Sequence, residues 1–128
     1  MAGGEWERLA TEVIIPALRE AAAELNEEDD IVAEYSEDPF GDACILWIAR
    51  RLSPSPFLSP QGSLAIHDEP AVPKLRIEEA DPNVSGGRPV VTVYLRQSAV
   101  SARSIKARAL TFAERVLSSE TAAAVQEP

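Results

Sequence analysis

The longest apolar run in the sequence, ACILWIA, extends from Ala43 to Ala49. Its length suits a β-strand, whereas a helix that spans a bilayer needs about 20 apolar residues. Successive side chains of a strand point to opposite faces, so a run without polar residues indicates a strand that is apolar on both faces. The sequence therefore predicts a central strand here, covered on at least one side by helices.

Strand patterns continue on both sides of this run. Residues 74–79 and 90–97 alternate most clearly between apolar and polar side chains, and 31–37 alternates well enough to form a third strand. Residues 63–67 are predicted as a short strand, because a structureless loop of about twenty residues from 53 to 73 would be unusual in a compact domain. The segments are joined by connections of hairpin length, which favours antiparallel pairing.

Each end of the chain has the pattern of an amphipathic helix. The first covers about 5–25, with Pro16 predicted to interrupt or kink it. The second follows a cap at Ser98 or Ser101, and residues 119–128 are expected to fray. The first helix's apolar stripe is Trp6, Leu9, Val13, Ala17, Ala21 and Leu25, and the last helix's is Ala102, Ile105, Ala109, Phe112, Ala113 and Val116.

These elements predict an α+β two-layer sandwich. An antiparallel sheet of four to five strands is flanked by the N-terminal and C-terminal helices, in the order α-β-β-(β)-β-β-α. The 128 residues are enough for one hydrophobic core and too few for two comfortable domains, so 1–128 is read as a single domain.

Composition limits the compartment and the partners. Hydrophobic residues make up 45% and charged residues 26%, as in soluble globular domains. Acidic Glu5, Glu7 and Glu12 stand where a signal peptide has a basic start and an apolar stretch, and the single cysteine, Cys44, fits a reducing compartment, so we expect a cytoplasmic protein. Ten arginines against two lysines, with twenty alanines, are typical of a GC-rich bacterial genome.

The net charge of −9 is unevenly distributed. Residues 1–48 hold thirteen acids and two bases, whereas residues 49–117 hold six acids and ten bases. Phosphate contacts need a positive surface, so the acidic total argues against nucleic acid as a partner. Such an asymmetric chain suits charge pairing with a copy of itself, and we expect a homodimer with no membrane association.

Candidate chemistry is sparse. One histidine and one cysteine do not make a metal-ligand set, and the acidic run 27–30 lacks the glycine and alternating oxygens of a calcium loop. Cys44 lies in an apolar strand, where burial raises a thiol pKa, and His67 beside Asp68 and Glu69 is more simply an exposed histidine than a base. We therefore predict no catalytic, cofactor or metal residues, and no enzyme activity.

Two surface features remain as partner-binding candidates. In SPSPFLSPQG, Ser53 to Gly62, prolines hold Phe57 and Leu58 on a stiff loop, where they either anchor a partner or, as we favour, fold back over the open end of the sheet. Arg103 and Lys106 lie on the basic side of the last helix and suit pairing with the acidic helix of a second subunit, or simple solvation.

The sequence thus predicts a non-enzymatic protein–protein interaction module, such as an adaptor, an inhibitor or a chaperone-like partner. The alternative is a small-molecule-binding or sensor domain with a pocket between the sheet and the helices. The aromatic residues expected near that pocket are Tyr35, Trp47 and Tyr94.

Overall fold

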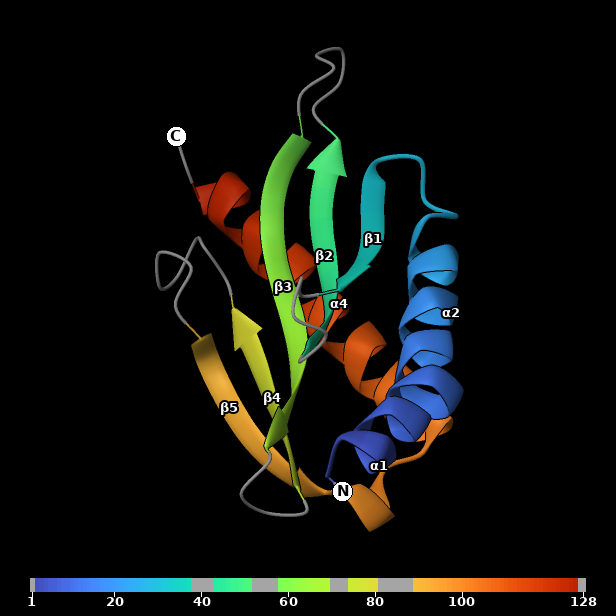
Figure 1. The fold of residues 1–128 in the computed structure, drawn as a ribbon. Helices are drawn as coiled ribbons and strands as arrows, with labels where there is room; N and C mark the ends of the chain where they lie inside the picture. Colours follow the sequence, from blue (N-terminus) through green and yellow to red (C-terminus); the bar gives the residue numbers. More distant parts are fainter. Residues whose placement is uncertain (1, 38–42, 52–57, 70–73, 81–88, 127–128) are drawn as a thin grey trace.

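The five strands form one antiparallel sheet in chain order (Figure 1). A computed structural model describes residues 2–37, 43–51, 58–69, 74–80 and 89–126. Every neighbouring pair is antiparallel and the spatial order is β1-β2-β3-β4-β5, which confirms the predicted α+β arrangement with five strands. The strands are β1 (Ile31–Glu37), β2 (Ala43–Arg51), β3 (Leu58–Glu69), β4 (Lys74–Ala80) and β5 (Pro89–Arg96).

The terminal helices cover one face of this sheet (Figure 1). The first is continuous through α1 (Ala2–Leu9), the π-helical segment η1 (Ala10–Ile14) and α2 (Ile15–Leu25). Pro16, predicted to interrupt or kink this helix, lies in the first turn of α2, and the π-helical turn ends two residues before it, at Ile14. After a short 3-10 turn, η2 (Gln97–Ala99), α4 (Ala102–Gln126) extends into the segment that we expect to fray.

The core lies between the helices and the covered face of the sheet. Alternation sends Cys44, Leu46 and Ile48 of β2 toward the helices, and these three side chains are almost completely buried. Trp47 points the other way and is 51% exposed, because helices lie on only one side of the sheet. The other large buried side chains include Ile14, Leu18, Leu64, Ile66, Leu75, Ile77, Ile105, Phe112 and Val116.

Strand β3 is much longer than the segment 63–67 predicted for it. Pro60 and Gly62, read as part of a loop, belong to this strand. Ile48 pairs with Gly62 and Ala49 with Pro60, so Gln61 is the extra residue of a β-bulge. A proline is tolerated at such a position because the bulge interrupts the ladder that its missing N–H could not complete. Phe57 lies outside the described residues, and Leu58 is described only as the first residue of β3.

The turn after α2 is tied to the sheet. Asn26 accepts a hydrogen bond from the amide of Ala33 and donates one to its carbonyl, both at 2.8 Å. Asp30 accepts from the guanidinium of Arg50 at 2.7 Å, which joins this turn to the end of β2. The acidic run 27–30 is thus anchored to the sheet at its last residue. No helix within the described residues is long and apolar enough to cross a bilayer.

Candidate functional site

The structure separates the three aromatic residues expected to share a pocket. Tyr35 lies on the helix-covered face of β1, where it is half-buried and the guanidinium carbon of Arg19 is 5.3 Å from the centre of its ring. Trp47 and Tyr94 lie on the uncovered face, where they are 51% and 54% exposed. The physical reason is the two-residue alternation of strands: Tyr35 pairs with Leu46, one residue before Trp47.

The two basic candidates on α4 differ from each other. Lys106 Nζ lies 3.0 Å from a carboxylate oxygen of Glu24 and 3.1 Å from one of Glu20, so it links α4 to α2 within the same chain. Hydrogen bonds to Glu24 and Glu20 raise the pKa of Lys106. Arg103 lies in the first turn of the same helix and is exposed. A partner's acidic helix would therefore compete with α2 for Lys106.

Cys44 and His67 lie on opposite faces of the sheet. Cys44 pairs with Ile66 and faces the helices, whereas His67 pairs with Ala43 and faces away from them. His67 is a strand residue whose Nε2 lies 3.2 Å from Glu78 Oε1. A thiol and an imidazole on opposite faces of one sheet cannot form a nucleophile–base pair, since that pair needs hydrogen-bond reach.

Burial of Cys44 and Tyr35 predicts a loss of stability at alkaline pH. Desolvation raises the pKa of both groups, and their mutual hydrogen bond raises that of Tyr35 further. A raised pKa in the folded state means stability that is fully present below the unfolded pKa, about 8.5 for a thiol, and is lost above it. Urea unfolding from pH 7 to pH 10 should show a falling free energy of unfolding. The free energy of unfolding should fall less steeply with pH in Cys44→Ala than in the wild type. Equal pH slopes in the two proteins would contradict a stabilising role for the buried thiol.

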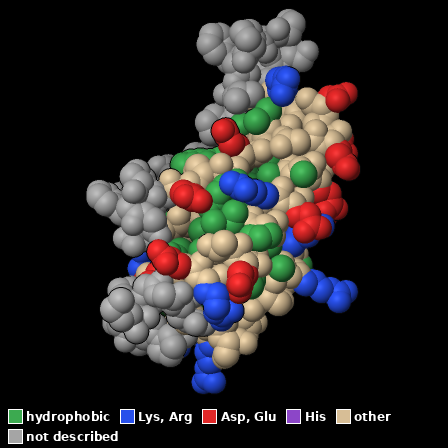
Figure 2. Space-filling model, turned by 45° about the vertical axis from the view of Figure 1, so that its right-hand side comes forward, with side chains coloured by type: hydrophobic (Ala, Val, Ile, Leu, Met, Phe, Trp, Pro, Cys, Tyr) green, Lys and Arg blue, Asp and Glu red, His purple; other side chains and the backbone are tan. Residues whose placement is uncertain are grey.

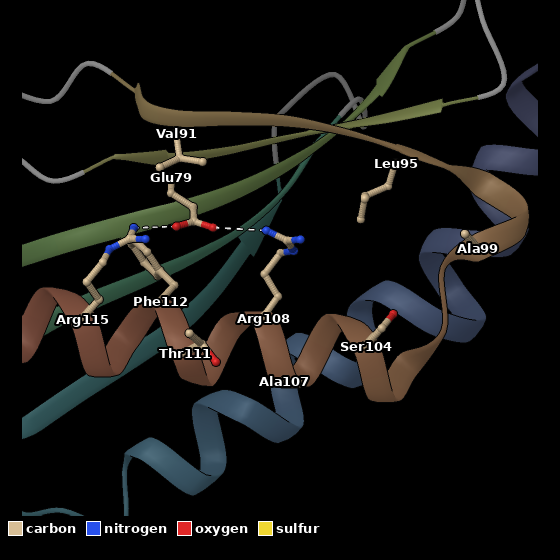
Figure 3. A pocket seen from close by; sticks show the side chains of 10 residues that line it. All are labelled: Glu79, Val91, Leu95, Ala99, Ser104, Ala107, Arg108, Thr111, Phe112 and Arg115. Atoms are coloured by element: carbon tan, nitrogen blue, oxygen red, sulfur yellow. Dashed lines mark hydrogen bonds and ion pairs between the residues drawn. The ribbon is translucent and has the colours of Figure 1, made fainter.

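A groove lies between α4 and strands β4 and β5 (Figure 3). Its volume is about 590 Å3, within the range of small-molecule sites. Strand β5 contributes Val91 and Leu95, which pair with Glu79 and Leu75 of β4 and so face the helix layer. The remaining lining residues are Ala99, Ser104, Ala107, Arg108, Thr111, Phe112 and Arg115.

Glu79 is the electrostatic centre of this groove. Its side chain is 5% exposed and points from β4 toward α4, between two arginines (Figure 3). Arg115 donates to Oε1 at 2.5 Å, while the nearest nitrogen of Arg108 lies 3.6 Å from Oε2. Arg115 also lies over the ring of Phe112, 5.6 Å from its centre. A buried carboxylate needs such partners, since an unpaired charge in the interior is costly.

Patterns in the sequence did not predict this groove as a candidate site. The alternation of β4 could have indicated the position of Glu79. Leu75 and Ile77 point inward, and Glu79, two residues after Ile77, points to the same face. An acidic residue in a core-facing position implies a basic partner. The arginines that supply it are 29 and 36 residues further along the chain, so only the tertiary structure identifies them.

The uncovered face of the sheet is the second candidate surface. Around Trp47 lie half-buried apolar neighbours on three strands, and we call this group the Trp47 patch: Val32, Ile45, Trp47, Ala49 and Ala65. Trp47 Nε1 donates to Ser36 Oγ at 2.7 Å, which fixes the indole ring. Figure 2 shows one side of the molecule on which hydrophobic side chains reach the surface between charged ones.

Charged residues separate the Trp47 patch from Tyr94. Arg76 of β4 donates to Glu78 at 2.8 Å and also forms an ion pair with Glu69 of β3. His67 completes this band through Glu78. Each acid in the band is therefore matched by a basic group, which lowers the cost of desolvating the band when another surface covers it.

Within the residues that the structure describes, no group of three or more histidine, cysteine or acidic side chains is arranged to hold a metal ion. The candidate surfaces are thus the groove with Glu79 at its centre and the uncovered sheet face. No protein-family model, no curated protein and no solved structure shows significant similarity to this chain.

Proposed function

We propose that this protein is a protein–protein interaction module that binds through the uncovered face of its sheet, with a second copy of the chain as the occupant. The observation that carries this proposal is the Trp47 patch. A tryptophan that is half exposed, held by Ser36 and surrounded by apolar side chains has the composition of an interface hot spot.

The surroundings of the patch also resemble an interface. Glu34 and Ser63 pair with Trp47 across the sheet, from β1 and β3 respectively, and make a polar border. Protein interfaces have this organisation, with an aromatic, apolar centre inside a polar rim that stays accessible to water. Covering the patch removes apolar surface from water without leaving unpaired charges at its centre.

The charge distribution favours a second copy as the occupant. Among the described residues, the uncovered face presents four bases, Arg51, Lys74, Arg76 and Arg96, and three acids, Glu34, Glu69 and Glu78. This face is thus close to neutral in a chain whose net charge is −9. Two copies repel each other least when these faces meet.

Face-to-face pairing also places the acidic helix layers far apart. Residues 5–30 contain nine acids and two bases, and α2 lies on the helix layer, on the opposite side of the sheet from the Trp47 patch (Figure 1). In a two-fold symmetric dimer each helix layer faces outward, and the same patch is used by both subunits. Salt screens repulsion between the distant acidic layers, so such a dimer should not weaken as salt is raised.

The test is Trp47→Glu, with Ala23→Glu as its matched control. Both variants add one negative charge at an exposed position, but Ala23 lies on α2. Because hot-spot residues contribute about 2 kcal/mol or more, Trp47→Glu should raise the dimer Kd about 30-fold or more in sedimentation equilibrium, and Ala23→Glu should change it little. Equal effects of the two variants would contradict the proposal. So would a wild-type protein that is still monomeric at a concentration of about 1 mM.

Fluorescence gives a second readout. The chain has two tryptophans, and Trp6 is buried in the core whereas Trp47 is exposed. The Trp6→Phe variant therefore reports on Trp47 alone. Its emission should shift to shorter wavelength, and its quenching by iodide should fall, as the protein concentration is raised through the dimer Kd. Emission independent of concentration, in a sample shown to dimerise, would place the interface elsewhere.

A further inference from the structure

The groove between α4 and β5 has one wall that is almost entirely apolar. Val91 and Leu95 face the helix layer from β5, yet both remain half-exposed, whereas their pairing partners on β4, Glu79 and Leu75, are buried. The difference arises because the helices cover the sheet only as far as β4. Ala107, a small residue on α4 opposite this wall, leaves the space between them open.

The side chains of α4 divide into two adjacent rows. One row packs into the core and contains Ile105, Ala109, Phe112, Ala113 and Val116. The other lines the groove and contains Ser104, Ala107, Arg108, Thr111 and Arg115. The second row follows the three- and four-residue spacing of one helix face, and Figure 3 shows Arg108 and Arg115 reaching from this face toward Glu79.

The charge inside the groove is positive by one unit. Glu79 supplies one negative charge, and Arg108 and Arg115 supply two positive charges. Arg115 is held in place by its hydrogen bond to Glu79 and by the ring of Phe112. The guanidinium of Arg108 lies 3.6 Å from Glu79, beyond hydrogen-bond length, and it makes no hydrogen bond to another side chain or to the backbone within the described residues. Its guanidinium therefore keeps its donors for another group.

The hydroxyl of Ser104 is not available to bind such a group. Its Oγ donates to the carbonyl of Ser101 at 2.9 Å and accepts from the amide of Ser101 at 3.0 Å, as part of the cap of α4. Ser104 thus contributes to the wall of the groove and does not bind a ligand through its hydroxyl. Arg108 is the residue of the groove that is left to bind a charged group of a ligand.

We propose that this groove binds a small monocarboxylate with an apolar body, whose carboxylate is held by Arg108 and whose body lies along Val91 and Leu95. An arginine presents parallel N–H donors that match the two oxygens of a carboxylate. A single negative charge balances the groove, whereas a cation would meet two arginines, and a doubly charged anion would add repulsion at buried Glu79. The site is distinct from the dimerisation surface proposed above.

Octanoate is the probe, and octanamide is its neutral counterpart of the same shape. Titration calorimetry on the full chain should give octanoate a millimolar or tighter Kd, the affinity expected of about ten heavy atoms, and octanamide a Kd about 10-fold weaker or more. Equal affinity for the two compounds would show that apolar burial alone drives binding and would overturn the assignment to Arg108. Absence of octanoate binding in the millimolar range would overturn the site.

Arg108→Gln and Arg103→Gln form the matched pair of variants. Both remove one positive charge from α4, but Arg103 does not line the groove. Arg108→Gln should weaken octanoate binding about 10-fold or more and affect octanamide little, whereas Arg103→Gln should change neither. Equal effects of the two variants would mean that octanoate senses only the net charge of the protein and would overturn the proposal.

A third variant, Ala107→Phe, fills the groove from an exposed helix position and does not depend on Arg108. It should abolish binding of both compounds while circular dichroism shows an intact fold. Trp47→Glu should leave octanoate binding unchanged, which separates this site from the dimer surface. If Ala107→Phe instead disrupts self-association and octanoate does not bind, the groove is a contact between subunits and the ligand site is refuted.

Discussion

Phe112→Ala is expected to lower the free energy of unfolding by about 3–5 kcal/mol. The ring is 1% exposed and belongs to the core row of α4, while its edge also reaches the groove. Truncation to alanine removes its burial from water and leaves a cavity that neighbouring helices and strands fill only in part. Arg115 also loses the ring over which its guanidinium lies.

Urea unfolding at pH 7, followed by far-UV circular dichroism, measures this loss. The neighbouring residue, Thr111, is exposed on the same helix turn, so Thr111→Ala is the matched control and should change stability by less than about 0.5 kcal/mol. A loss below about 1 kcal/mol for Phe112→Ala would mean that the ring is not packed as described.

Gly62→Ala is expected to be the second most damaging substitution, at about 1–3 kcal/mol. A Cβ atom at position 62 would stand 2.7 Å from the carbonyl oxygen of Ala80 and 2.9 Å from Cζ of Phe112. Gly62 directly follows the bulge in β3, where the backbone passes close to both β4 and α4. The carbonyl belongs to the sheet and cannot rotate away, so the strand itself must shift.

A double-mutant cycle separates the two clashes. Leucine at position 112 stays apolar but lacks the Cζ atom, so Phe112→Leu should relieve part of the cost of Gly62→Ala. The double variant should be more stable than the sum of the single effects by about 0.5 kcal/mol or more. Strict additivity would contradict contact between position 62 and the ring. The neighbouring substitution Ser63→Ala, on the uncovered face, should be nearly neutral and serves as the control.

Much of the architecture was predictable because it depends on local periodicity. The stripe from Trp6 to Leu25 has helical spacing, and most of its members are buried against the sheet. Leu75 and Ile77 alternate with charged neighbours and lie inward as predicted. Turn-forming residues after Leu25 end α2 where expected. Each of these predictions needs only the residues within one element.

Strand β3 shows where local patterns fail. Prolines at 54, 56 and 60 suggested a loop, since proline cannot complete a strand ladder. The bulge at Gln61 allows Pro60 to lie within the strand. A bulge depends on how β3 pairs with β2, and no pattern within β3 reveals that pairing. The strand therefore begins at Leu58, five residues earlier than its alternation indicates.

The amino-acid sequence by itself determined the order of elements, the antiparallel sheet and the identity of most core residues, because hydrophobic periodicity acts over a few neighbouring residues. Only the tertiary structure decided that ACILWIA has one covered and one open face, so that Trp47 stands in solvent while Cys44 is buried. It also brought Arg108 and Arg115 to Glu79. Both results depend on which surfaces two distant helices reach, and that is set by packing across the whole chain.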